Sequence, residues 1–283
     1  MFHPHLLQNK FALITGGGSG LGLSMAKRFA ELGATIAVCG RNADRLAKAG
    51  QEIQQAGNGR EAITFVCDVR DYQAVVTAID TLVAQHGLPD ILVNNAAGNF
   101  LAATEDLSPG GFDAVVKIVL YGTFNCTQVL GKKWIAAHRR GSILNIVTTY
   151  AWNGSAFVVP SACAKAGVLA MTRSLAVEWA AYGIRLNAIA PGPFPTEGAW
   201  QRLLPTKEIA EQARQRIPAG RFGEHQELAN LAVFLVAEGV DFITGEVVTI
   251  DGGEALAGAG QFSQFIQQDR EQFKRLLAMM RGK

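Results

Sequence analysis

The sequence of 283 residues predicts an α/β protein with a doubly wound parallel sheet of about seven strands. Two observations lead to this fold class. Short apolar segments rich in β-branched residues alternate with segments of helical spacing. In addition, a glycine-rich turn, residues 16–22, separates the first strand from the first helix. Since no internal repeat, low-complexity linker or composition break divides the sequence, we expect a single domain over residues 1–257 and a helical extension over residues 258–283.

The expected elements follow one another in order. Phe11–Thr15 is a short apolar strand, and Leu21–Leu32 has the spacing of a helix. A second strand, Ala34–Cys39, precedes a second helix, Ala43–Ala56. The remaining strands are expected at Ala62–Cys67, Ile91–Asn94, Ser142–Thr148, Arg185–Ala190 and Val247–Ile250. Helices fit between them, notably Ser161–Ala181 after the fifth strand.

Two segments depart from this alternation. Pro191–Pro218 carries five prolines, which favours a lid or substrate loop over regular structure. The tail Gly258–Lys283 is predicted to be an amphipathic helix that packs against its own domain or a partner subunit. Its apolar stripe consists of Phe262, Phe265, Ile266, Phe273, Leu276, Leu277 and Met280. Membrane contact is disfavoured, because interfacial helices carry strongly basic faces.

Composition and charge exclude several classes. The net charge of +2, with no basic cluster, argues against nucleic acid as a partner. Four cysteines are scattered without a C-x-x-C pair, which favours reduced thiols in a cytoplasmic compartment over disulfides or a metal site. Residues 1–10 are too short and polar for a signal peptide, and we expect no apolar run of membrane-spanning length. His3 and His5 are interpreted as part of a solvated end, not as a metal pair.

The glycine-rich turn predicts a dinucleotide site of the Rossmann type. Glycines allow a tight turn and a close approach of backbone N–H groups to a diphosphate at a helix N-terminus. The position between a strand and a helix is the context that such a site requires. The residues concerned are Gly16, Gly17, Gly18, Ser19, Gly20, Leu21 and Gly22.

Two further residues bear on the choice of dinucleotide. Arg41 stands at the end of the second strand, where an NAD site usually has a carboxylate for the ribose diol. A guanidinium suits the 2′-phosphate of NADP, so we expect NADPH as cofactor. Asp68, at the end of the third strand, could accept a hydrogen bond from the adenine amino group. The alternatives are a solvated Arg41 that opens a helix and an Asp68 that acts as a helix N-cap.

Together with the glycine turn, three further motifs resemble the short-chain dehydrogenase/reductase family. They are Asn94-Asn95-Ala96-Ala97-Gly98, Lys165, and Pro191-Gly192-Pro193. The resemblance runs from Lys10 to about Gly253. It implies that Lys165 bonds the nicotinamide ribose and that Thr148 replaces the usual catalytic serine. It also implies cofactor contacts from Asn95, Ala96, Gly98, Pro191, Gly192, Pro193 and Phe194.

One position departs from the family pattern: Ser161 stands where Tyr-x-x-x-Lys has its tyrosine. A serine hydroxyl is too weak an acid to replace that phenol. The surrounding sequence, with Gly98-Asn99-Phe100, resembles the NADPH-dependent 2,4-dienoyl-CoA reductase branch, which carries its tyrosine fifteen residues before the lysine. Tyr150 has that spacing. The resemblance implies that Tyr150 and Asn99 hydrogen-bond the thioester oxygen and that Ser161 helps to orient Lys165 or the cofactor.

The resemblance also suggests contacts with an acyl-CoA substrate. Arg70 and Arg202 would bind phosphate groups, Phe100 would cover the acyl portion, and Ser108 completes the set. Solvated surface charge is the alternative for both arginines. Tyr121 stands where most relatives have an asparagine that holds a water chain behind the lysine, which puts a proton relay through Lys165 in doubt. The resemblance further implies a homotetramer.

Three functions remain open at this point. The first is reduction of 2,4-dienoyl-CoA thioesters in β-oxidation of unsaturated fatty acids. The second is reduction of another enoyl or carbonyl substrate, with Tyr150 as the acid. The third is a catalytically weak NADP-binding subunit. The joint presence of Lys165, Tyr150 and Asn99 favours an enzyme.

Overall fold

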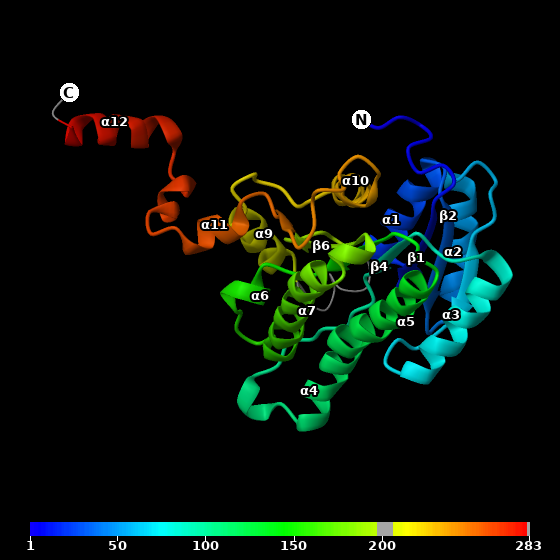
Figure 1. Cartoon of the computed structure of the whole chain (residues 1–283). Coiled ribbons are helices and arrows are strands. Elements are labelled where there is room, and N and C mark those ends of the chain that lie inside the picture. Colours follow the sequence, from blue (N-terminus) through cyan, green and yellow to red (C-terminus); the bar gives the residue numbers. More distant parts are fainter. Residues whose placement is uncertain (197–205, 282–283) are drawn as a thin grey trace.

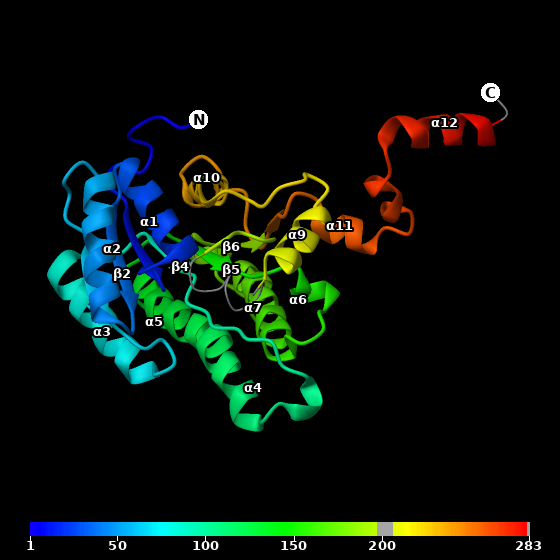
Figure 2. The same cartoon turned by 180° about the vertical axis from the view of Figure 1, so that it is seen from behind.

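A single seven-stranded parallel sheet forms the centre of the protein (Figures 1 and 2). The structure is a computed structural model that describes residues 1–196 and 206–281. The strand order is β3-β2-β1-β4-β5-β6-β7. The strands are β1 (Phe11–Thr15), β2 (Thr35–Gly40), β3 (Ile63–Val66), β4 (Ile91–Asn94), β5 (Gly141–Ile146), β6 (Ile184–Pro191) and β7 (Val247–Ile250). The predicted fold class is confirmed, with strand ends shifted by one or two residues.

The order reverses at β1, which pairs with β2 on one side and with β4 on the other. In such sheets a ligand crevice opens beyond the carboxyl ends of the strands at the reversal. The central strands are buried on both faces; every residue of β1, β4 and β5 is buried. Their near-continuous apolar sequences therefore reflect helices on both sides of the sheet.

Helices cover both faces of the sheet (Figure 1). One face packs against α1 (Gly20–Glu31), α2 (Ala43–Ala56) and α10 (His225–Val236). The other face packs against α3 (Tyr72–His86), α5 (Gly122–Ala136) and α7 (Val159–Glu178). Two shorter helices, α4 (Pro109–Val116) and α6 (Tyr150–Asn153), lie beside α7.

A π-helical turn, Lys117–Tyr121, joins α4 and α5 into one long helical run. The run Pro109–Ala136 is long and apolar enough to cross a membrane by length and composition, so the expectation that no segment reaches that length is wrong. Of its most apolar window, 56% is buried inside the protein. That burial is typical of a core helix, and α5 accordingly packs against α3 and the sheet.

The proline-rich segment is more regular than expected. A helix, α9 (Lys207–Gln215), begins after Thr206, whose side chain accepts a hydrogen bond from the Ile209 N–H as an N-cap. The prediction of an irregular loop over residues 191–218 is therefore wrong for this part. The prolines that favoured a loop lie at the two ends of this segment, and no proline interrupts residues 206–217.

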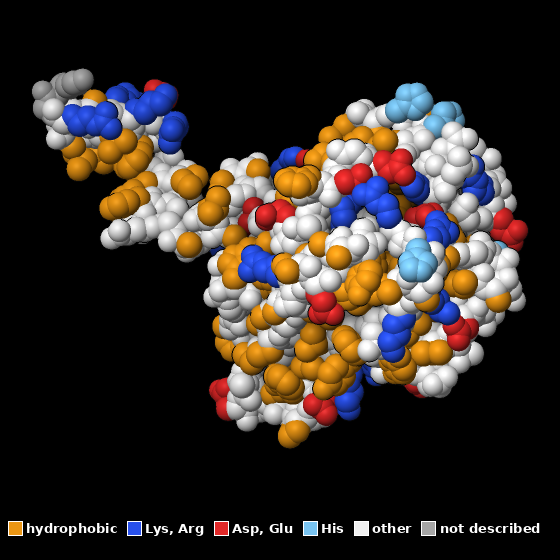
Figure 3. Space-filling view, viewed as in Figure 1, with side chains coloured by type: hydrophobic (Ala, Val, Ile, Leu, Met, Phe, Trp, Pro, Cys, Tyr) orange, Lys and Arg blue, Asp and Glu red, His pale blue; other side chains and the backbone are white. Residues whose placement is uncertain are grey.

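The tail is not one helix. It consists of α11 (Glu254–Ala259), a 3₁₀ turn (Ser263–Gln267) and α12 (Arg270–Met280), and it projects away from the body (Figures 1 and 2). Phe265 stacks on Phe262 and on Phe273. The predicted packing on its own domain is wrong, since Phe262 is 69% and Met280 75% exposed. The apolar side chains stand out on the tail in Figure 3. Packing against a partner subunit stays a prediction.

Candidate active site

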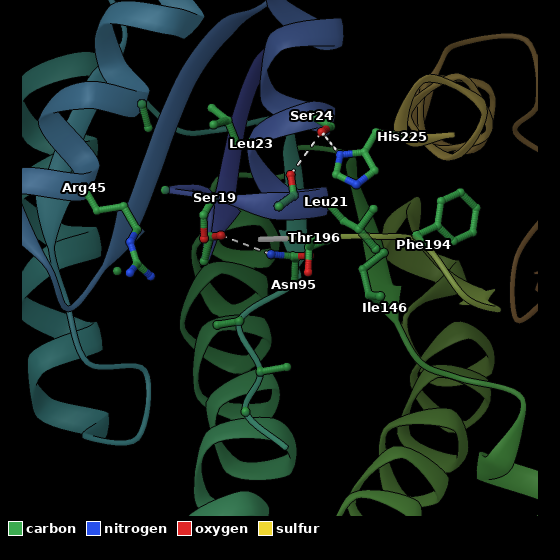
Figure 4. Close-up of a pocket in the computed structure, with 18 of the residues that line it drawn as sticks. Ser19, Leu21, Leu23, Ser24, Arg45, Asn95, Ile146, Phe194, Thr196 and His225 are labelled. Carbon is green, nitrogen blue, oxygen red and sulfur yellow. Dashed lines mark hydrogen bonds between the residues drawn. The ribbon is translucent and has the colours of Figure 1, made fainter. Parts of the chain in front are cut away.

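A cleft of about 1430 Å³ lies at the carboxyl ends of the central strands. It joins the glycine turn after β1 to the segments that follow β4, β5 and β6 (Figure 4). It brings together most of the residues predicted from the sequence. These are Gly16, Gly18, Ser19, Gly20, Leu21, Arg41, Asp68, Asn95, Ala96, Gly98, Asn99, Thr148, Tyr150, Ser161, Lys165, Pro191, Gly192 and Phe194. The volume is large enough for a dinucleotide and a second molecule beside it.

The glycine turn is fixed against the end of β4. Gly16 has φ +65°, a conformation that disfavours side chains. The side-chain amide of Asn95 donates to the carbonyls of Thr15 and Gly16 at 3.1 and 3.2 Å. A Cβ on Gly22 would lie 2.4 Å from that amide nitrogen, so only glycine fits there. The turn therefore holds a rigid shape in front of the N-terminus of α1, as a diphosphate site requires.

Two arginines line the side of the cleft formed by the end of β2 and the first turn of α2. Arg41 is the predicted residue, and Arg45 is an additional one. Figure 4 shows Arg45 reaching from α2 beside the turn that carries Ser19. Neither guanidinium forms a salt bridge with a described residue. Two free cations beside the expected ribose suit a 2′-phosphate better than a diol.

Asp68 lines the same region, but its carboxylate is engaged. The guanidinium of Arg70 donates to both Asp68 oxygens, at 2.6 to 3.0 Å, and lowers the pKa of that carboxyl. Arg70 itself does not line the cleft. The predicted contact of Arg70 with a CoA phosphate therefore competes with an ion pair already formed.

Lys165 is buried beside the end of β5. Ser161 and Lys165 lie four residues apart on α7 and so share one face of the helix. The Lys165 ammonium donates to the backbone carbonyl of Ile146, the last residue of β5. Burial lowers the pKa of Lys165 to about 8. The side chain is only 6% exposed, and the cleft is its route to solvent and ligands.

Tyr150 places its hydroxyl beside Ser161, although the two residues lie on different helices. The Tyr150 Oη lies 3.0 Å from the Ser161 Oγ. The Asn99 Nδ2 donates to the same Tyr150 oxygen at 3.5 Å. The backbone N–H of Phe100 donates to the Asn99 Oδ1 at 2.9 Å, which fixes the amide so that its N–H groups face the tyrosine. A phenol and an amide therefore converge at one point of the cleft.

Thr148 supplies a hydroxyl without a partner. Its Oγ1 is buried and forms no hydrogen bond with any described residue. A buried polar atom without a partner is costly, which marks it as a group that a ligand can satisfy. The residue lies two positions after the end of β5 and lines the same cleft as Lys165. The role of Thr148 in place of the usual catalytic serine stays a prediction.

Several predicted residues lie elsewhere. Gly17 packs against Val38, Gly22 packs against Asn95, and Pro193 accepts a hydrogen bond from the Gly223 N–H outside the cleft. Phe100 and Ser108 lie together near Gly111 at the start of α4, where Ser108 is the N-cap. Arg202 lies outside the described residues.

Tyr121 also lies away from the site. It sits on the π-helical turn, is 53% exposed and does not line the cleft. Lys165 donates directly to Ile146 instead. Tyr121 therefore does not contribute to the lining of the cleft, and its effect on a proton relay through Lys165 stays a prediction.

Among the cleft residues that the sequence did not single out are Arg45, Thr196 and His225. Arg45 lies four residues after Arg41, in the first turn of α2, so a search for a second cation near Arg41 would have found it. Thr196 follows the Pro191-Gly192-Pro193 motif closely. His225 comes from the start of α10, and no local pattern marks it.

Comparisons with known proteins agree with this architecture. A family model described as enoyl-(acyl carrier protein) reductase matches residues 16–254. An uncharacterized oxidoreductase of Caenorhabditis elegans is 44% identical over 285 residues, covering 99% of this chain and 91% of that protein. A probable 2,4-dienoyl-CoA reductase, (2E)-enoyl-CoA-producing, of Bacillus subtilis is 45% identical over 251 residues, covering 88% and 98%.

Two solved structures are similar over most of the chain. A short-chain dehydrogenase from Bacillus anthracis has a TM-score of 0.81 and 44% identity, covering 89% of this chain and 98% of that one. A gluconate 5-dehydrogenase from Burkholderia cenocepacia, solved in complex with NADP and tartrate, has a TM-score of 0.83 and 34% identity, covering 89% and 98%. With its sheet, glycine turn and buried lysine, the chain belongs to the short-chain dehydrogenase/reductase family and is an oxidoreductase with a nicotinamide cofactor.

Proposed function

We propose that the protein is an NADPH-dependent 2,4-dienoyl-CoA reductase. The observation that carries the proposal is the position of the Tyr150 hydroxyl, 3.0 Å from the Ser161 Oγ and 3.5 Å from the Asn99 Nδ2. A phenol thus stands beside the serine that replaces the family tyrosine. The name of the similar Bacillus subtilis protein supports the same substrate class.

The described residues fit a nicotinamide dinucleotide. The glycine turn and the N-terminus of α1 would hold the diphosphate, and Arg41 and Arg45 would hold the 2′-phosphate. Lys165 and the unpartnered hydroxyl of Thr148 would face the nicotinamide end. When bound, NADPH supplies the hydride.

The substrate carbonyl needs stabilisation more than it needs an acid. Hydride addition at the δ-carbon of a 2,4-dienoyl thioester sends an electron pair through the conjugated system to the thioester oxygen. The Tyr150 O–H and an Asn99 N–H can both donate to that oxygen, as in an oxyanion hole. The Ser161 hydroxyl can donate to the Tyr150 oxygen when the phenol turns to the substrate. Water supplies the proton that completes the reaction, and this proton is added to carbon, so no acid is required at position 161.

The direct test is an assay of NADPH absorbance with purified protein. We expect NADPH loss with a 2,4-dienoyl-CoA and none with a 3-ketoacyl-CoA. Turnover of the ketoacyl substrate alone would favour a carbonyl reductase with Tyr150 as the acid. No turnover of either would favour an NADP-binding subunit. NMR of the product would show whether the remaining double bond is at the 2 or the 3 position.

Cofactor preference is expected to depend on both arginines. Substitution of Arg41→Ala or Arg45→Ala removes one charge-assisted contact with the 2′-phosphate, so we expect KM for NADPH to rise about tenfold for each variant. KM for NADH, which has no such phosphate, should change less than twofold. Steady-state kinetics with both cofactors measures this ratio. An equal rise for NADH would contradict the assigned position of the phosphate.

A further inference from the structure

His225 connects two walls of the cleft. It is the first residue of α10, and its ring contacts two residues that are far away in the sequence. The Nδ1 atom lies 2.8 Å from the Oγ of Ser24 on α1. The Nε2 atom lies 2.5 Å from the backbone carbonyl of Pro195. Figure 4 shows the ring between α1 and α10, facing the cleft.

The donor and acceptor roles of the ring follow from its partners. A carbonyl oxygen can only accept, so Nε2 carries the proton that bonds Pro195. The Ser24 hydroxyl has one proton, which it donates either to the carbonyl of Gly20 at 3.0 Å or to a neutral Nδ1 at 2.8 Å. The chain of contacts thus runs from the glycine turn through Ser24 and His225 to Pro195.

Pro195 belongs to a segment, residues 191–196, that follows β6 and forms the wall opposite the glycine turn. The next residue, Thr196, touches that turn: a Cβ on Gly20 would lie 3.3 Å from the Thr196 Cγ2. The segment is also fixed at Pro193, whose carbonyl accepts from the Gly223 N–H at 3.1 Å. His225 is therefore a second attachment, two residues nearer to the point where the walls meet.

We propose that His225 is a positioning residue for the nicotinamide cofactor, acting through its Nε2 contact with Pro195. By holding residues 195 and 196 against the glycine turn, it keeps the cleft in the shape that binds the dinucleotide. Without this contact the segment spends part of its time away from the turn, and the apparent affinity falls in proportion. Because the Pro193 attachment remains, the fold does not depend on His225.

Substitution by asparagine or glutamine at position 225 distinguishes the contact of Nδ1 with Ser24 from the contact of Nε2 with Pro195. The terminal amide of asparagine reaches the place of Nδ1 and can bond only Ser24. The amide of glutamine reaches the place of Nε2 and can donate only to Pro195. His225→Gln should therefore bind NADPH within about threefold of the wild type. His225→Asn and His225→Ala should each raise the Kd about tenfold, the effect expected for one to two lost hydrogen bonds.

The Kd is measured by calorimetry with NADPH alone, and thermal unfolding shows that each variant is folded. We expect the Kd and the KM for the cofactor to rise in His225→Asn and His225→Ala, while kcat at saturation changes less than twofold. His86→Ala, at the exposed end of α3, is the control for removal of a histidine and should bind as the wild type does. The proposal is overturned if all three His225 variants bind equally, or if asparagine restores binding and glutamine does not.

The inference rests on the proposed cofactor but not on the proposed substrate. Absence of dienoyl-CoA turnover in the wild type would overturn the proposed function and leave the binding comparison unaffected. Equal binding by the glutamine and asparagine variants would overturn the role of His225 and leave the proposed function unaffected. The two failures are therefore distinguishable.

Discussion

Substitution of Tyr150→Phe is expected to lower kcat by about 10² to 10³-fold, because removal of one oxyanion-hole donor has that effect in other enzymes. The phenol ring and its packing remain, so KM for NADPH should change little. Ser161→Ala should lower kcat less than tenfold, since Ser161 bonds the Tyr150 hydroxyl and not the substrate. Steady-state kinetics with a 2,4-dienoyl-CoA measures both variants.

The order of these two effects decides the role of each residue. Tyr182→Phe serves as the control, because Tyr182 is 51% exposed on a 3₁₀ turn after α7 and lies away from the cleft. It should have wild-type kinetics. A larger loss for Ser161→Ala than for Tyr150→Phe would show that the serine, and not the displaced tyrosine, acts on the substrate.

Substitution of Lys165→Met is expected to make the protein more stable and nearly inactive. Burial lowers the lysine pKa from 10.5 to about 8, so the folded state resists its positive charge at neutral pH. Methionine keeps the apolar stem without the charge. The shift corresponds to about 3 kcal/mol, from which the lost hydrogen bond to the Ile146 carbonyl subtracts about 1 kcal/mol. Activity should fall at least 10²-fold, because the cation that faces the nicotinamide end of the cleft is lost.

The difference in stability between Lys165→Met and the wild type should depend on pH. Between about pH 8 and 10.5 the unfolded chain binds the Lys165 proton and the folded chain does not, so wild-type stability rises with pH in this window. The advantage of the methionine variant should therefore be full below pH 8 and disappear above 10.5. Chemical denaturation across this range measures it, and wild-type activity should fall above pH 8.

A matched control is Lys132→Met on α5, an exposed lysine. It should change neither stability nor activity. If Lys165→Met were destabilised at pH 7 relative to this control, the burial of Lys165 would have to be accompanied by stronger favourable contacts than its bond to Ile146.

The sheet and the centre of the site could be predicted from the sequence because their signals are local. The apolar strand at Phe11–Thr15 and the glycine turn after it lie within one short segment. The place of Tyr150 came from a resemblance that rests on a short stretch of sequence, the fifteen residues between Tyr150 and Lys165. The tail, in contrast, was predicted as one helix from its periodicity, and Gly260 closes α11 before the stripe begins.

The features that the sequence did not predict depend on contacts that form only in the folded protein. His225 meets Ser24 across 201 residues of sequence, and no periodicity reports such a contact. Arg70 was taken for a phosphate ligand, although Asp68 two residues earlier already provides its partner. Whether an arginine is free is a property of the folded surface, which residue type alone does not reveal.

The two halves of the site sit on separate helices. The lysine and serine belong to the long helix α7, while the tyrosine belongs to α6, a helix of four residues that ends at Asn153 and is followed by Gly154. The two reacting groups thus reach one point of the cleft from two different helices. The position of the tyrosine along the sequence can therefore differ from the usual one while Lys165 and the cofactor part of the cleft stay in place.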